Sequence, residues 1–142
     1  MAFLKDLNAI SRSTTLFRDD KLKRYGISGY QVKYLFNVCN NRGVSQDELA
    51  RALFVNKSNV TRQIAALERA GLVRREQAAE DRRAYRIYPT AKAEELMPTI
   101  RAVNDEWKEL ICAGLSREDI EKLGEVLEKL VNNAKRYGEE RR

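Results

Sequence analysis

The sequence predicts a mainly α-helical domain with a small two- or three-stranded β-wing, and three observations carry this prediction. Capping signals open several segments whose apolar residues recur at helical spacing. Gly71 follows one of these segments at the position where a helix favours a left-handed residue. Two β-prone runs then enclose a polar loop, residues 77–83. Short helices followed by such a ribbon indicate a winged helix-turn-helix, which we expect over residues 28–90.

The length and composition favour one domain, residues 1–142, with a core of its own. No apolar run approaches the roughly 18 residues of a membrane span, and the first residues lack the pattern of a signal peptide. We therefore expect a cytoplasmic protein.

The net charge is +6. The basic excess lies in residues 1–90, because residues 91–142 hold more acidic than basic side chains. This distribution favours a polyanionic partner.

The chain contains no histidine, so the commonest transition-metal ligand and the usual general base are missing. We find no glycine-rich phosphate loop and no supported acid pair. The sequence therefore predicts no metal site, no cofactor and no enzymatic activity. Cys39 and Cys112 form no CxxC pair and are predicted to be core thiols, with any redox role left open.

The first helix is predicted from about Phe3 to Arg18, followed by a charged loop through Gly26. Ser28 and Gln31 form a capping box that announces the next helix. Its expected buried face consists of apolar side chains at helical spacing: Val32, Leu35, Phe36 and Cys39.

Two further helices complete the predicted helix-turn-helix. The first opens with a capping box, Ser45 and Glu48. The second begins at Asn56, a favourable N-cap residue, and ends at Gly71. Its core face is predicted to be Val60, Ile64 and Leu67. Its other face is small, polar and basic, which suits close approach to a groove: Ser58, Thr61, Arg62 and Ala65.

The C-terminal third predicts two more helices. One runs from Thr90 to about Cys112, and Pro98 is expected to kink it. The other opens at Ser116 and carries a continuous apolar stripe up to Tyr137. Residues 138–142 are predicted to be a disordered tail. The helices of residues 1–18 and 91–137 carry apolar stripes that a winged domain alone does not bury, so we expect them to form a homodimer. The alternative is that these helices pack on their own domain.

Two stretches resemble the MarR family of transcription regulators. Residues 80–90 are similar to the family pattern Asp-x-Arg-(Ala/Ser)-x-x-(Val/Ile)-x-Leu-Thr, with Pro89 in place of leucine. Residues 56–62 with residues 67–75 also look like the family's. The resemblance covers essentially the whole chain. It implies a transcription regulator, expected to be a repressor, that binds a palindromic double-stranded DNA operator as a homodimer.

The resemblance also implies that Arg83 enters the minor groove while Asp81 braces it, and a narrow groove favours a guanidinium on electrostatic grounds. Lys57 and Ser58, at a helix start, suit phosphate. Asn59, Thr61 and Arg62 are the candidates for base edges. The expected DNA-binding set is Ser45, Gln46, Asn56, Lys57, Ser58, Asn59, Thr61, Arg62, Arg75, Asp81, Arg82 and Arg83.

Many members of the family release DNA when a small aromatic or phenolic compound binds between the dimerisation and DNA-binding parts. If this chain has such an effector, the expected lining residues are Arg12, Arg18, Tyr30 and Tyr34. Sensing through an N-terminal cysteine or through zinc-binding histidines loses support, because the first helix lacks cysteine and the chain lacks histidine. The rival hypothesis is a winged-helix adaptor that binds protein or RNA.

Overall fold

The computed structural model of the protein describes residues 1–140. Within them it has six α-helices, two short 3-10 helices and one three-stranded sheet, which confirms the predicted fold class. The chain divides into two compact units, residues 1–107 and the segment from Lys108 onward. The elements are α1 Ala2–Leu22, η1 Lys23–Tyr25, η2 Gly29–Gln31, α2 Val32–Asn40, β1 Val44–Ser45, α3 Gln46–Leu53, α4 Lys57–Arg69, β2 Val73–Gln77, β3 Tyr85–Pro89, α5 Ala91–Ile111 and α6 Arg117–Glu140.

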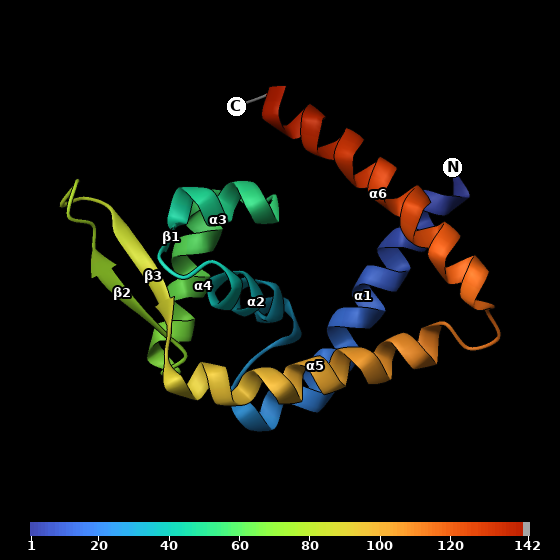
Figure 1. Ribbon diagram of the computed structural model, residues 1–142, viewed down its shortest axis with the longest axis horizontal. Coiled ribbons are helices and arrows are strands. Elements are labelled where there is room, and N and C mark those ends of the chain that lie inside the picture. The colour runs from blue at the N-terminus through green and yellow to red at the C-terminus, as the bar shows by residue number, and fades with distance from the viewer. Residues whose placement is uncertain (141–142) are drawn as a thin grey trace. The chain divides into compact units, whose positions relative to one another are not determined.

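The sheet has the order β1-β3-β2 and is antiparallel throughout. Ile87 in the central strand lies opposite Val44 on one side and Arg75 on the other. The two β-prone runs of the sequence are β2 and β3, whereas the two-residue strand β1 was not predicted. Figure 1 shows the β2–β3 hairpin at one side of α2, α3 and α4. Ile87 and Val73 are buried, so one face of the sheet covers the core.

The core of the winged unit is built where the helical stripes meet this sheet. Val60, Ile64 and Leu67 of α4 are completely buried, as predicted. In α2 the prediction was partly wrong. Tyr34 and Val38 are completely buried there, while Phe36 and Cys39 only pack against the edge of the core. The reason is that α2 contacts η2, α3 and β3, so packing surrounds more of its circumference than one stripe.

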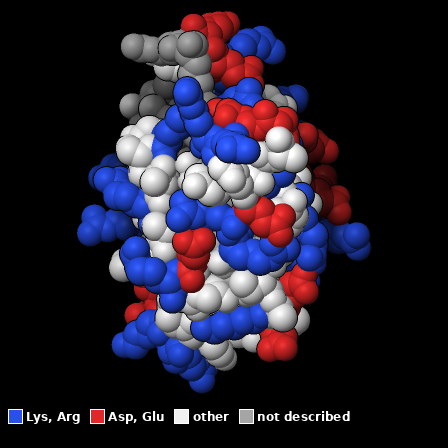
Figure 2. Space-filling view, turned by 90° about the vertical axis from the view of Figure 1, so that its left-hand side faces the viewer, with Lys and Arg blue, Asp and Glu red and all other residues white. Residues whose placement is uncertain are grey.

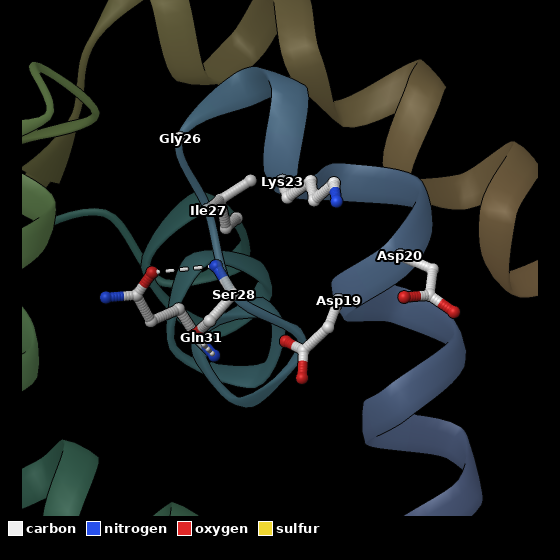
Figure 3. Close-up of a pocket in the computed structure, with 7 residues that line it drawn as sticks. All are labelled: Asp19, Asp20, Lys23, Gly26, Ile27, Ser28 and Gln31. Carbon is white, nitrogen blue, oxygen red and sulfur yellow. Dashed lines mark hydrogen bonds between the residues drawn. The ribbon is translucent and has the colours of Figure 1, made fainter.

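The junction between α1 and η2 is the tightest backbone approach in this unit. The capping box predicted at Ser28 and Gln31 is present, although it opens a 3-10 turn ahead of α2. Gln31 N–H donates to Ser28 Oγ at 3.3 Å, and Ser28 N–H donates to Gln31 Oε1 at 3.0 Å, as Figure 3 shows for the second bond. Gly29 is buried against α1 and donates its N–H to Asp19 Oδ1 at 2.6 Å.

Helix α1 extends one turn beyond its predicted end, because Leu22 is needed in the core and is completely buried there. Within residues 1–107, α1 packs on α5 through Trp107. The indole Nε1 donates to Thr14 Oγ1 at 2.8 Å, and the indole ring stacks on Phe17 with 4.9 Å between centroids. Helix α5 is continuous through the exposed Pro98; a kink there stays a prediction.

Helix α6 begins as predicted at a Ser116 cap. Asp119 N–H donates to Ser116 Oγ at 3.0 Å, and Ser116 N–H donates back to Asp119 Oδ2 at 3.2 Å. The predicted disordered tail was wrong for residues 138–140. These residues continue the helix, since one glycine costs a helix only about 1 kcal/mol. Arg141 and Arg142 lie outside the described residues.

Both terminal helices expose large apolar side chains. They are Phe3, Leu4, Ile10 and Leu16 in α1, and Leu123, Val126, Leu130, Val131 and Tyr137 in α6. Among residues 1–140, no helix is both long enough and apolar enough to cross a membrane.

Candidate nucleic-acid interface

Helix α4 presents a polar, exposed face on the side opposite its buried stripe. Asn56 caps its start, because Asn56 Oδ1 accepts from Asn59 N–H and from the Ser58 hydroxyl, each at 2.8 Å. Ser58, Thr61 and Arg62 are exposed. No carboxylate among residues 1–140 pairs with the Arg62 guanidinium. The predicted division of α4 into a core face and an open face is therefore present.

One flank of this open face contacts α3. Lys57 Nζ lies 2.8 Å from Asp47 Oδ1, and Thr61 Oγ1 lies 3.4 Å from Gln46 Oε1. Ser45 caps α3 by accepting from Glu48 N–H at 3.1 Å. The ammonium that we expected to be free for phosphate is therefore paired with a carboxylate. The pair is well exposed, so the ion pair itself contributes little stability and can exchange partners.

The other flank contacts η2 and α2 through one tyrosine hydroxyl from each. Tyr30 donates to Asn59 Oδ1 at 3.0 Å, and Tyr34 donates to the same oxygen. The ring of Tyr34 is completely buried. Burial, followed by the neighbouring Tyr30 hydroxyl, raises the pKa of the Tyr34 hydroxyl. One residue expected at the DNA and two expected at an effector thus meet in a single hydrogen-bonded group.

Short-range hydrogen bonds hold the loop between β2 and β3 in place. Asp81 Oδ1 accepts from Arg83 N–H at 2.9 Å, and Asp81 O accepts from Ala84 N–H at 3.1 Å. Gln77 Nε2 donates to Arg82 O. Asp81 therefore braces the backbone of Arg83, whereas we expected it to brace the guanidinium. Arg82 and Arg83 are exposed, and within residues 1–140 neither guanidinium has a carboxylate partner.

Other basic side chains near the wing are held by acidic ones. The Arg75 guanidinium donates two hydrogen bonds to the Glu68 carboxylate, from Nε to Oε2 at 3.2 Å and from Nη2 to Oε1 at 3.1 Å. That bond raises the pKa of the Arg75 guanidinium. Arg86 pairs with Glu80 and donates to Gly43 O at 3.1 Å. Figure 2, which looks onto the wing side, shows basic side chains with acidic ones between them.

Arg86 was not among the predicted site residues. Its contact with Gly43 O joins residues 43 positions apart, so no local sequence pattern indicates it.

Comparison with known proteins shows which family this chain resembles. Residues 25–84 match the model of the MarR family. A MarR protein from Peptoclostridium difficile, 26% identical, matches all of this chain and 93% of its own length with a TM-score of 0.96. Along its whole length the chain is similar to solved members of the MarR family.

Two further MarR-like relatives extend the comparison. A MarR-family transcriptional regulator from Listeria monocytogenes, crystallised with a 26mer DNA, is 25% identical with a TM-score of 0.88, covering 95% of this chain and 90% of its own. The HTH-type transcriptional regulator YybA of Bacillus subtilis, itself uncharacterised, is 23% identical over 94% of this chain and 89% of its own length.

Of the four effector residues predicted from the MarR resemblance, Tyr30 and Tyr34 lie together, with 5.9 Å between their ring centroids. Arg12 is exposed on α1. Arg18 donates to Asn104 Oδ1 at 2.8 Å, and burial lowers the pKa of its guanidinium. Tyr30 and Tyr34 bond to Asn59. None of the four lines either of two surface pockets. One, of about 380 Å³, is lined by Asp19, Asp20, Lys23, Gly26, Ile27, Ser28 and Gln31 (Figure 3). The other, of about 400 Å³, is lined by Arg24, Tyr25, Lys92, Glu95, Leu96 and Thr99.

Two carboxylates in the pocket of Figure 3, Asp19 and Asp20, disfavour an aromatic anion there. An organic effector therefore stays a prediction, and neither pocket is assigned to it.

Proposed function

We propose that the chain is a transcription regulator of the MarR family that binds double-stranded DNA sequence-specifically, as a homodimer on a palindromic operator, and acts as a repressor. The observation that carries the proposal is the position of three guanidinium groups on α4 and the wing loop, those of Arg62, Arg82 and Arg83, which have no carboxylate partner among residues 1–140. The DNA in the crystals of the Listeria monocytogenes relative supports extending this role to the present chain.

Each contact has a chemical reason. Arg62, one turn into α4, has the reach and the two parallel donors that suit a guanine edge in the major groove. Lys57 and Ser58, with the free amides of the helix start, suit phosphate. Lys57 exchanges Asp47 for phosphate when DNA is bound. Arg83 suits the electronegative minor groove. We assign Ser45, Gln46 and Arg75 to the phosphate backbone, because all three lie beside these elements.

Dimerisation follows from the apolar side chains left exposed on α1 and α6. Covering them with a second copy removes the unfavourable contact of apolar surface with water. A two-fold axis also repeats α4 once in each half-site, about 34–36 Å apart. A dimer bound in this way excludes other proteins from the operator, which is the basis for proposing repression.

Selection from a pool of random duplexes, followed by titration at two salt concentrations, tests the proposal. Arg62→Ala should relax base preference at one position in each half-site. Lys57→Ala should weaken binding to all sequences about equally and lower the salt slope by roughly one unit. Asp47→Asn, which frees the Lys57 ammonium, is the matched control and should strengthen binding to all sequences.

The protein–protein or RNA adaptor predicts a different result. Intact protein that selects no palindrome, and whose duplex binding shows no steep salt dependence, would overturn the proposed function. Uniform weakening by Arg62→Ala, with base preference unchanged, would leave sequence recognition to other residues of α4 and to DNA shape.

A further inference from the structure

Asn59 lies where the open face of α4 meets α2, one helical turn before Arg62. Its carbonyl oxygen has two lone pairs, and two tyrosine hydroxyls use them. Its side-chain nitrogen carries two donors and has no hydrogen-bond partner among residues 1–140. Asn59 is half-exposed. The acceptor of the side chain is therefore occupied inside the protein, and its two donors have no partner among the described residues.

We propose that Tyr30 and Tyr34 convert Asn59 into a donor-only contact, so that it favours a base that offers acceptors without a neighbouring donor, guanine or thymine, over adenine, whose N7 acceptor lies beside the N6 amino donor. The inference rests on the proposed function and names the specificity of one position in that site. An unrestrained asparagine recognises adenine with both of its groups. Its amide donates to N7, and its carbonyl accepts from the N6 amino group. With the carbonyl occupied, the N6 amino group of adenine would meet no acceptor.

The two tyrosines hold the Asn59 carbonyl firmly, because the Tyr34 hydroxyl cannot reach water. Tyr34 is completely buried, so rotating Asn59 away would remove the acceptor that its hydroxyl uses inside the protein. The Tyr30 ring is packed on the other side by Lys33, whose Nζ lies 4.3 Å from the ring centroid.

The backbone of Asn59 is fixed as well. Its N–H donates to Asn56 Oδ1 at 2.8 Å, at the capped start of α4. The amide group can therefore adjust only by turning about its own side-chain bonds, and the two hydroxyls oppose that movement. The orientation is set before DNA arrives.

The experiment compares the bases selected from a random duplex pool by the intact wild-type protein and by the double variant Tyr30→Phe/Tyr34→Phe. Wild type should select guanine or thymine at one position of each half-site. The double variant frees the carbonyl, so the frequency of adenine at that position should rise on the order of tenfold relative to wild type. Tyr85→Phe is the matched control, because Tyr85 stands on β3 away from Asn59, and it should leave the selected base unchanged.

A second variant keeps the test decisive if the double variant does not fold. Asn59→Asp retains an acceptor for both tyrosines and removes the donors, so the preference for guanine or thymine should disappear at the same position while neighbouring preferences remain.

An unchanged base preference in the folded double variant, or in Asn59→Asp, would overturn the inference while the operator selection of the wild type stands. Selection of adenine or cytosine by the wild type at the Asn59-dependent position would overturn it too. Wild-type protein that selects no duplex sequence would instead overturn the proposed function, and this inference with it.

Discussion

Gly29 leaves no space for a side chain where η2 meets α1. A Cβ added there would overlap the carbonyl oxygen of Thr15 and lie 2.8 Å from Arg18 Cβ. Gly29→Ala should lower the free energy of unfolding by about 3 kcal/mol, the upper part of the usual range for overpacking. Urea unfolding of both proteins measures this.

Gly26→Ala is the control for Gly29→Ala. Gly26 has φ 74° and nothing within 4 Å of an added Cβ, so its cost is backbone strain alone, about 1 kcal/mol. An equal or larger loss for Gly26→Ala would contradict the steric argument at Gly29.

Tyr34 makes the stability of the fold depend on pH in the alkaline range. Since burial raises its pKa in the folded state, its contribution to stability is complete below the ordinary tyrosine pKa of about 10 and is lost as pH rises above that value. Wild-type protein should therefore lose stability more steeply than Tyr34→Phe between about pH 10 and pH 11. Urea unfolding across that range tests the difference; parallel pH profiles of the two proteins would refute it.

At the level of elements, the wing allows the two arginines of its loop to be separated. Arg83→Ala should weaken operator binding by roughly 1–3 kcal/mol, as for a good specific contact. Its melting temperature should stay unchanged, because the side chain is exposed and pairs with no carboxylate in the described structure. Arg82→Ala is the matched variant. If Arg82→Ala abolished binding while Arg83→Ala did not affect it, the roles of the two arginines would have to be exchanged.

The starts of four helical segments were predictable because the signals for them are local. Ser28, Ser45, Asn56 and Ser116 all accept from an N–H three residues later, as their sequence context indicates. The apolar face of α4 was predictable for the same reason, since one helix with one stripe defines it.

The remaining features depend on residues far apart in the sequence. Strand β1 has only two residues and exists because β3, some 40 residues later, pairs with it. The pairing of Lys57 with Asp47, and of Asn59 with Tyr34, joins different helices at spacings with no helical period. Such contacts decide which side chains on α4 are free, so the sequence predicted the interface as a region and missed which of its groups were engaged.

At the level of the whole molecule, the exposed apolar side chains of α1 and α6 predict dimerisation. Leu123→Glu and Leu130→Glu in α6 should each shift the protein towards monomer at micromolar concentration, because each would bury a charge in an apolar interface. Sedimentation measures the shift, and truncation from Ser116 should give monomer or aggregate. Wild-type protein that sediments as a soluble, folded monomer at that concentration would refute the dimer and the two-half-site arrangement.

The two-bond contact between Glu68 and Arg75 ties the last turn of α4 to β2. The backbone reinforces it, since Leu72 N–H donates to Leu67 O at 2.9 Å and Gly71 N–H to Glu68 O at 3.0 Å. These contacts restrain the spacing between α4 and the hairpin, which favours a groove of one width. On the proposed function, the duplex must supply the adjustment. Flexible pyrimidine–purine steps between the helix and wing contacts would then raise affinity at base pairs that no side chain touches.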